Sequence, residues 1–121
     1  MPRILVVDDA DTIRDALRTL LVGNGFEVLE ADSGERGLEV LEQQAVDLVI
    51  SDLNMPGMDG LTMCGHIKER GHSMPIFMLT TQSNPDLKAR AKEYGVVAWI
   101  VKPHKDEILL KGIQKVLKLP T

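Results

Sequence analysis

Residues 47–60 of this chain read DLVISDLNMPGMDG, and the fold follows from the pattern that they contain. The apolar run at 48–51 is continuous rather than alternating, which indicates a strand buried on both faces, as in a parallel sheet. Asp52 follows this run directly, and the turn dipeptides Pro56-Gly57 and Asp59-Gly60 come next. The stretch therefore predicts a buried strand that ends in a carboxylate, then a loop and a helix.

The same succession of strand and helix recurs on both sides of this stretch. Runs of strand length lie at 4–7, 27–31, 48–51, 76–80 and 98–101. The run at 27–31 is partly polar and suits a strand near a sheet edge, whereas the other four are nearly continuous and predict burial on both faces. Amphipathic segments between the runs predict helices over 11–22, after the N-cap Ser33, after Asp59-Gly60, over about 85–94 and over about 105–118.

Five successive units of strand and helix predict an α/β fold. Helices have to cover both faces of a parallel sheet, and right-handed crossovers then favour a doubly wound, five-stranded sheet. With 121 residues, 44% of them hydrophobic, the chain is long enough for one compact domain and too short for two. We therefore expect residues 1–121 to form a single domain with no output domain.

Charge and cysteine content exclude several classes of partner. The 14 basic and 18 acidic residues give a formal net charge of −4, the wrong sign for a protein that neutralises nucleic-acid phosphates. Cys64 is the one cysteine and cannot form an internal disulfide. No apolar run approaches the roughly 20 residues of a membrane span. These features predict a cytoplasmic protein without nucleic-acid or membrane partners.

Polar side chains with complementary chemistry follow four of the five predicted strands. Ligands of doubly wound sheets bind beyond the carboxyl ends of the strands, where the strand order reverses. If the first and third strands are neighbours, three carboxylates meet there and repel one another, and a cation has to resolve that repulsion. Oxygen ligands without a nearby histidine or cysteine favour Mg²⁺. The residues at the four strand ends are Asp8-Asp9, Asp52, Thr80-Thr81 and Lys102.

These residue types suit phosphoryl chemistry. Lys102 and Thr80 supply donors for phosphoryl oxygens, and Asp52 is the candidate nucleophile that would form an acyl phosphate. Each feature also has a plain structural interpretation, because acidic pairs often cap helices and Pro-Gly and Asp-Gly are ordinary turn dipeptides. The coincidence of acids, hydroxyl and lysine at different strand ends favours a functional site.

Four segments together resemble the receiver domain of two-component response regulators, in particular its CheY-like single-domain members. They are ILVVDD at 4–9, DLVISDLNMPGMDG at 47–60, PIFMLT at 75–80 and the dipeptide Lys102-Pro103. The resemblance covers essentially the whole chain. It implies a flavodoxin-like three-layer sandwich with five helices and the strand order 2-1-3-4-5. It also implies a cis bond before Pro103.

The resemblance implies a role for each site residue. Asp52 would accept a phosphoryl group from the phosphohistidine of a sensor histidine kinase or from small phosphodonors. Thr80 and Lys102 would bind phosphoryl oxygens, and Thr80 would then move inward and draw Trp99 with it. Asp8, Asp9 and Asp52, with the backbone carbonyl of Asn54, would hold Mg²⁺. The lifetime of the phosphoryl group would be tuned at Asn54, Thr81 and Gln82.

The implied output is a protein contact, so we expect a monomeric signalling protein rather than an enzyme. Its target would dock on the face formed by the fourth helix, fifth strand and fifth helix. Trp99 stands where tyrosine or phenylalanine is more usual, Thr81 is bulkier than the usual alanine or glycine, and His104 replaces a frequent phenylalanine.

Other functions use some or all of the same residues. A Mg²⁺-dependent phosphohydrolase would also use an aspartate nucleophile, but Asn54 stands where its second acid would be. A flavodoxin-like carrier would need a phosphate-binding loop and more than 3% aromatic residues. A phosphate sink, which drains phosphoryl groups from a kinase, shares every residue with the switch. The pathway, whether chemotaxis or another, the kinase and the target stay open.

Overall fold

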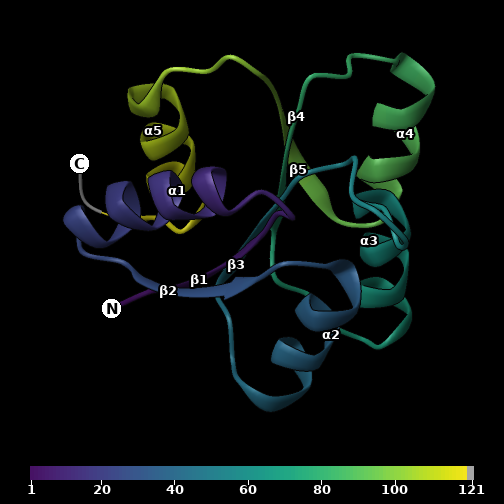
Figure 1. Ribbon diagram of the computed structural model, residues 1–121, viewed down its shortest axis with the longest axis horizontal. Coiled ribbons are helices and arrows are strands. Elements are labelled where there is room, and N and C mark those ends of the chain that lie inside the picture. The colour runs from purple at the N-terminus through teal and green to yellow at the C-terminus, as the bar shows by residue number, and fades with distance from the viewer. Residues whose placement is uncertain (120–121) are drawn as a thin grey trace.

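A computed structural model describes residues 1–119 and shows a five-stranded sheet between two layers of helices (Figure 1). The strand order is β2-β1-β3-β4-β5, and every neighbouring pair is parallel. Both features agree with the sequence-based expectation. The strands are β1 (Arg3–Val7), β2 (Glu27–Ala31), β3 (Leu48–Ser51), β4 (Ile76–Thr80) and β5 (Val96–Val101).

The helices divide between the two faces of the sheet. Helices α1 and α5 share one buried hydrophobic cluster, whereas α2, α3 and α4 pack on the cluster of the opposite face (Figure 1). Successive side chains of a strand point to opposite faces of the sheet, so each strand contributes to both clusters. In β1, Ile4 and Val6 face α1 and α5, whereas Leu5 and Val7 face the other layer. The helices are α1 (Asp11–Gly23), α2 (Gly34–Gln43), α3 (Gly60–Glu69), α4 (Pro85–Glu93) and α5 (Asp106–Val116).

Side-chain caps explain why three of the helices begin where the sequence predicts. Ser33, Asp59 and Asn84 each accept a hydrogen bond from a backbone N–H in the first turn of α2, α3 and α4. Such caps satisfy donors that have no partner within the helix. The boundaries differ slightly elsewhere, since β5 begins at Val96 and α5 is confined to 106–116.

The predicted burial of β5 on both faces is wrong. β5 pairs only with β4 and forms a sheet edge, and its burial is partial along most of its length. Val97 is 57% exposed and Val101 is 40% exposed. An apolar run alone does not distinguish an edge strand from a central one, because the pairing order is set by residues far apart in sequence. In the described residues, no helix is long and apolar enough to span a membrane.

Candidate functional site

The pairing of β1 with β3 brings three aspartates to one point on the carboxyl edge of the sheet. Val7 and Ser51 are register partners, so Asp8 and Asp52 leave the sheet side by side. One carboxylate oxygen from each of Asp8, Asp9 and Asp52 lies within 4.8 Å of the others. The acidic cleft that the sequence predicts is therefore present.

Asp8 is the most deeply buried member of this acidic cluster, with 3% of its surface exposed. Burial raises the pKa of its carboxyl above the ordinary value of 3.8, and the charges of Asp52 and Asp9 raise it further. The Ala10 N–H, which donates to Asp8 Oδ1 at 2.9 Å, and the Lys102 ammonium act in the opposite direction on this pKa. The net upward shift means that burial disfavours the charged form of the Asp8 carboxyl, and a nearby cation would oppose this effect.

Lys102 supplies a positive charge from the loop between β5 and α5. Its Nζ lies 3.7 Å from Asp52 Oδ1 and 3.9 Å from Asp8 Oδ2. The backbone N–H of Lys102 donates to the carbonyl of Thr80 at 2.8 Å, which ties this loop to the end of β4. The peptide bond between Lys102 and Pro103 is cis, as expected. The lysine thus stands beside both the candidate nucleophile and a candidate metal ligand.

Thr80 is fully buried at the end of β4, and its Oγ1 accepts a hydrogen bond from the Gln82 N–H at 3.1 Å. Thr81 and Gln82 are exposed on the loop that follows, and Asn54 is exposed on the loop between β3 and α3. Trp99 does not bond to Thr80; its Nε1 donates to the carbonyl of Gln82 at 2.8 Å. The structure therefore gathers the acids and Lys102 and links Trp99 to the loop after Thr80.

Gly60 is a structural part of this site that the sequence interpretation missed. Asp59-Gly60 is typical of a turn, yet a Cβ placed on Gly60 would lie 2.2 Å from the backbone oxygen of Asp52. The Gly60 N–H also donates to the Leu53 carbonyl at 2.8 Å. The start of α3 thus packs directly on the backbone of the candidate nucleophile. No sequence signal shows this approach, since a turn glycine and a contact glycine look alike.

Known proteins match this chain over most of its length. The chain matches the response regulator receiver domain family over residues 4–114. It is 37% identical over 116 residues to the chemotaxis protein CheY of Bacillus subtilis (strain 168), covering 95% of this chain and 97% of that protein. Against the response regulator protein FleR of Pseudomonas aeruginosa it is 38% identical over 108 residues, covering 89% of this chain and 23% of FleR. It spans 52% of the transcriptional regulatory protein AfsQ1 of Streptomyces coelicolor.

Solved structures show the same architecture. The chemotaxis protein CheY4 of Vibrio cholerae superimposes with a TM-score of 0.90 at 36% identity, covering 96% of this chain and 98% of that chain. The response regulator TrrA of Thermotoga maritima, solved in complex with Mg²⁺-BeF, gives a TM-score of 0.85 at 33% identity, covering 96% and 99%. Receiver domains bind Mg²⁺ at an acidic pocket, and this chain has an acidic cluster of Asp8, Asp9 and Asp52. The chain belongs to the response regulator receiver domain family, the phosphoryl-accepting signalling domains of two-component systems.

Proposed function

We propose that Asp52 accepts the phosphoryl group and that Asp8, Asp9 and Asp52 hold Mg²⁺ beside it, with the backbone carbonyl of Asn54 completing the protein's ligands. The observation that carries this proposal is the meeting of three carboxylates within 4.8 Å. Their oxygens are hard ligands of the kind that Mg²⁺ prefers. The upward shift in the pKa of Asp8 further supports a cation there, because the buried charge lacks full compensation.

The chemistry assigned to Asp52 is a phosphoryl transfer. A carboxylate oxygen attacks phosphorus as the bond between phosphorus and the donor's histidine nitrogen breaks, so the product is an acyl phosphate and a free histidine. Mg²⁺, when bound, would offset the charge of the phosphoryl oxygens. The Lys102 ammonium is 3.7 Å from Asp52 Oδ1 and is placed to pair with a phosphoryl oxygen. The Thr80 hydroxyl, at the end of the adjoining β4, would supply a further donor.

The phosphoryl group would act on the rest of the molecule through Thr80 and Trp99. If the Thr80 hydroxyl turns to a phosphoryl oxygen, the loop that begins at Thr81 loses its present contact between Thr80 Oγ1 and the Gln82 N–H. Trp99 holds the same loop by its hydrogen bond to the Gln82 carbonyl. The shift would thereby reach β5. Charge-assisted hydrogen bonds of this kind bias a two-state element by a few kcal/mol at most, so both states have to lie close in free energy.

The proposed partners are a sensor histidine kinase and a target protein that docks on α4, β5 and α5. A groove of about 600 Å³ runs between α4 and β5, and Lys88, Lys92, Val97 and Trp99 line it. This groove combines apolar side chains with two lysines, and it is the surface that we propose for the target. We propose the cytoplasm as the compartment, because the kinase's phosphoryl group comes from ATP there, and a monomer as the working unit.

Intact-protein mass spectrometry tests the assignment of Asp52. The chain is incubated with acetyl phosphate or phosphoramidate, with and without Mg²⁺, beside the variants Asp52→Asn and Asp32→Asn. Asp32 follows β2 at the same sheet edge and is exposed, so it is a matched control outside the acidic cluster. We expect one metal-dependent phosphoryl adduct on the native chain and on Asp32→Asn, and none on Asp52→Asn. A folded native chain that takes no adduct with Mg²⁺ present contradicts the proposal.

Fluorescence tests whether phosphorylation of Asp52 changes the structure around Trp99. Trp99 is the one tryptophan of the chain and contacts the loop that would respond to phosphorylation. An effector predicts that acetyl phosphate with Mg²⁺ changes the emission of Trp99 in the native chain but not in Asp52→Asn. Full labelling of Asp52 without any change in emission would contradict the proposed path through Thr80 and Trp99.

A further inference from the structure

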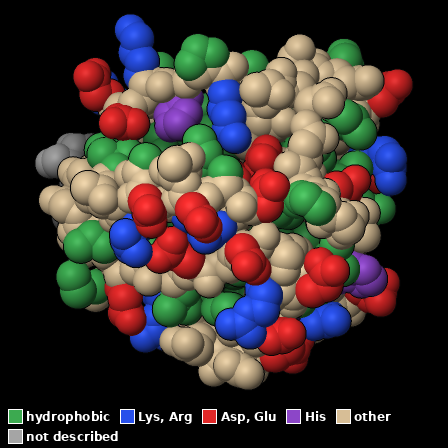
Figure 2. All heavy atoms as spheres, in the orientation of Figure 1, with side chains coloured by type: hydrophobic (Ala, Val, Ile, Leu, Met, Phe, Trp, Pro, Cys, Tyr) green, Lys and Arg blue, Asp and Glu red, His purple; other side chains and the backbone are tan. Residues whose placement is uncertain are grey.

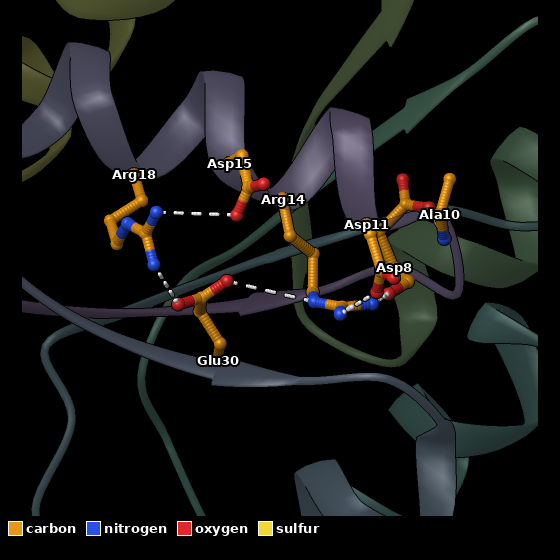
Figure 3. A network of polar contacts seen from close by, with 7 residues as sticks. All are labelled: Asp8, Ala10, Asp11, Arg14, Asp15, Arg18 and Glu30. Atoms are coloured by element: carbon orange, nitrogen blue, oxygen red, sulfur yellow. Dashed lines mark hydrogen bonds and ion pairs between the residues drawn. The ribbon is translucent and has the colours of Figure 1, made fainter.

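Arg14 lies behind the acidic cluster, on the first turns of α1. Its side chain is 14% exposed, whereas that of Arg18, one turn further along the same helix, is 47% exposed. Arginine is seldom buried to this extent unless its donors are paired. Figure 3 shows the Arg14 guanidinium directed at the end of β1 and at β2, with Arg18 beside it. The buried guanidinium of Arg14 therefore needs partners among the surrounding segments.

The guanidinium of Arg14 contacts three separate segments. Nη1 donates to the backbone carbonyl oxygen of Asp8 at 2.6 Å, and Nη2 pairs with the carboxylate of Asp11. Nε lies 3.6 Å from Glu30 Oε1 on β2. The planar fork of arginine can bond in several fixed directions at once, which a lysine cannot do. Arg14 thus braces the loop between β1 and α1 against the neighbouring strand (Figure 3).

The position of this brace matters because the Asp8 carbonyl belongs to the peptide unit that joins Asp8 to Asp9. Two further bonds orient Asp8: its N–H donates to the Ala31 carbonyl at 3.1 Å, and its Oδ1 accepts from the Ala10 N–H at 2.9 Å. The Arg14 contact completes this set from the carbonyl side. The orientation of that peptide unit determines the directions in which the side chains of Asp8 and Asp9 leave the backbone.

The charge of Arg14 is offset by its surroundings. Asp11 and Glu30 pair with it, while Arg18 shares Glu30 at 3.1 Å and pairs with Asp15 at 3.2 Å. The network holds two guanidinium groups and three carboxylates, so it adds no net positive charge behind the cluster. Figure 2 shows acidic and basic side chains intermixed over α1 and β2. The role of Arg14 is consequently geometric rather than electrostatic.

We infer that Arg14 is a positioning residue for the divalent cation: its hydrogen bond to the Asp8 carbonyl holds Asp8 and Asp9 in the geometry that binds Mg²⁺. This inference rests on the proposed function, since it needs the acidic cluster to be a metal site. Groups that orient metal ligands typically affect affinity by about 10- to 100-fold when removed. We expect the lower end of that range, about 10-fold, because the bonds of Asp8 to the Ala31 carbonyl and the Ala10 N–H remain.

Calorimetric titration of Mg²⁺ into the full chain, without any phosphodonor, tests this role. The variants are Arg14→Gln, Arg14→Lys and, as the matched control, Arg18→Gln. Arg18 shares Glu30 with Arg14, but its second ion pair is to Asp15 rather than to the Asp8 loop. We expect about 10-fold weaker binding for Arg14→Gln and an intermediate loss for Arg14→Lys, which keeps the positive charge and one donor nitrogen but loses the planar fork. Arg18→Gln should bind within about 2-fold of the native chain.

Thermal unfolding without Mg²⁺ separates positioning from folding. If Arg14→Gln does not fold, Arg14→Lys carries the test alone, and native-like binding by that variant overturns the inference. Equal or tighter binding by a folded Arg14→Gln also overturns it, as does an equal loss in Arg18→Gln. If the native chain binds no Mg²⁺, the proposed metal site itself is contradicted. Failure of the proposed function is thereby distinguished from failure of the role of Arg14.

Discussion

The centre of the sheet and its β5 edge are built differently. All residues of β3 are buried, and α3 buries five of its ten residues against the sheet. By contrast, Ala91 is the one buried residue of α4, and β5 is partly exposed along most of its length. Segments with few buried apolar contacts open at lower free energy than the core does. The proposed phosphoryl chemistry at Asp52 therefore lies on tightly packed elements, whereas the proposed response at α4 and β5 lies on loosely packed ones.

The largest expected effect concerns the rigid side, at Gly60. A Cβ there would lie 2.2 Å from the Asp52 carbonyl oxygen, and neither backbone segment can move away without disturbing β3 or α3. We expect Gly60→Ala to lower the free energy of unfolding by about 3 kcal/mol, the upper range for overpacking. Urea unfolding monitored by circular dichroism measures this change.

Gly65 on the same helix is the matched control for that substitution. The atom nearest to a Cβ at Gly65 is a ring carbon of Tyr94 at 3.6 Å, which is ordinary van der Waals contact. Gly65→Ala should therefore be neutral or stabilising by up to about 1 kcal/mol, from helix propensity. If both alanines behave alike, the close approach of α3 to Asp52 is not what constrains this end of the sheet.

The next largest expected effect concerns the buried carboxyl group of Asp8. The pKa of Asp8 is raised in the folded state, so this group favours folding below its unfolded pKa and loses that contribution as pH rises through the folded pKa. We expect Asp8→Asn to raise the melting temperature at pH 7 in EDTA, and to do so less at acid pH. Scanning calorimetry at both pH values checks this. A lower melting temperature for the variant at pH 7 would contradict it.

A smaller effect is expected at the β5 edge. Trp99→Phe removes the hydrogen bond from the indole to the Gln82 carbonyl, which is 2.8 Å long and partly exposed. We expect a loss of at most about 1 kcal/mol in the free energy of unfolding. Amide hydrogen exchange should speed up in the loop over residues 81–84 and leave β1 and β3 unchanged. Faster exchange in β1 as well would show that the two regions are not energetically separate.

The smallest expected effect is the reaction of the Cys64 thiol with an added reagent, which measures how tightly α3 is packed. Burial raises the pKa of this thiol to about 12, with a further contribution from Asp59, so little thiolate is present at neutral pH. We expect almost no reaction with a disulfide reagent in the native state and rapid reaction in urea. Fast native labelling would place α3 among the loosely packed elements.

Local signals predicted much of this molecule. The apolar runs located all five strands, and Ser33 and Asp59-Gly60 marked two helix starts because each acts on its own first turn. The acidic cluster could be predicted because parallel strands end at one edge, so residues that follow paired strands must meet. The helix starts need only local sequence, whereas the acidic cluster also needs the pairing of β1 with β3, which the resemblance to receiver domains supplied.

The features that escaped prediction depend on distances between segments. The exposure of β5 follows from its place at the edge of the sheet. The approach of Gly60 to Asp52 depends on how closely α3 packs on β3, and the bond from Arg14 to Asp8 depends on the path of α1 across β1. A glycine in a turn and an arginine on a charged helix face carry no mark of such contacts in the sequence.

Locating the acyl phosphate along the chain distinguishes Asp52 from the other carboxylates of the acidic cluster. Borohydride reduces an aspartyl phosphate, and peptide mass spectrometry then locates the altered residue in a chain treated with acetyl phosphate and Mg²⁺. The rigid carboxyl edge of β3 predicts reduction at residue 52, abolished by EDTA and absent from Asp52→Asn. Reduction at Asp8, Asp9 or any residue outside the acidic cluster, with Asp52 unaltered, would contradict the account.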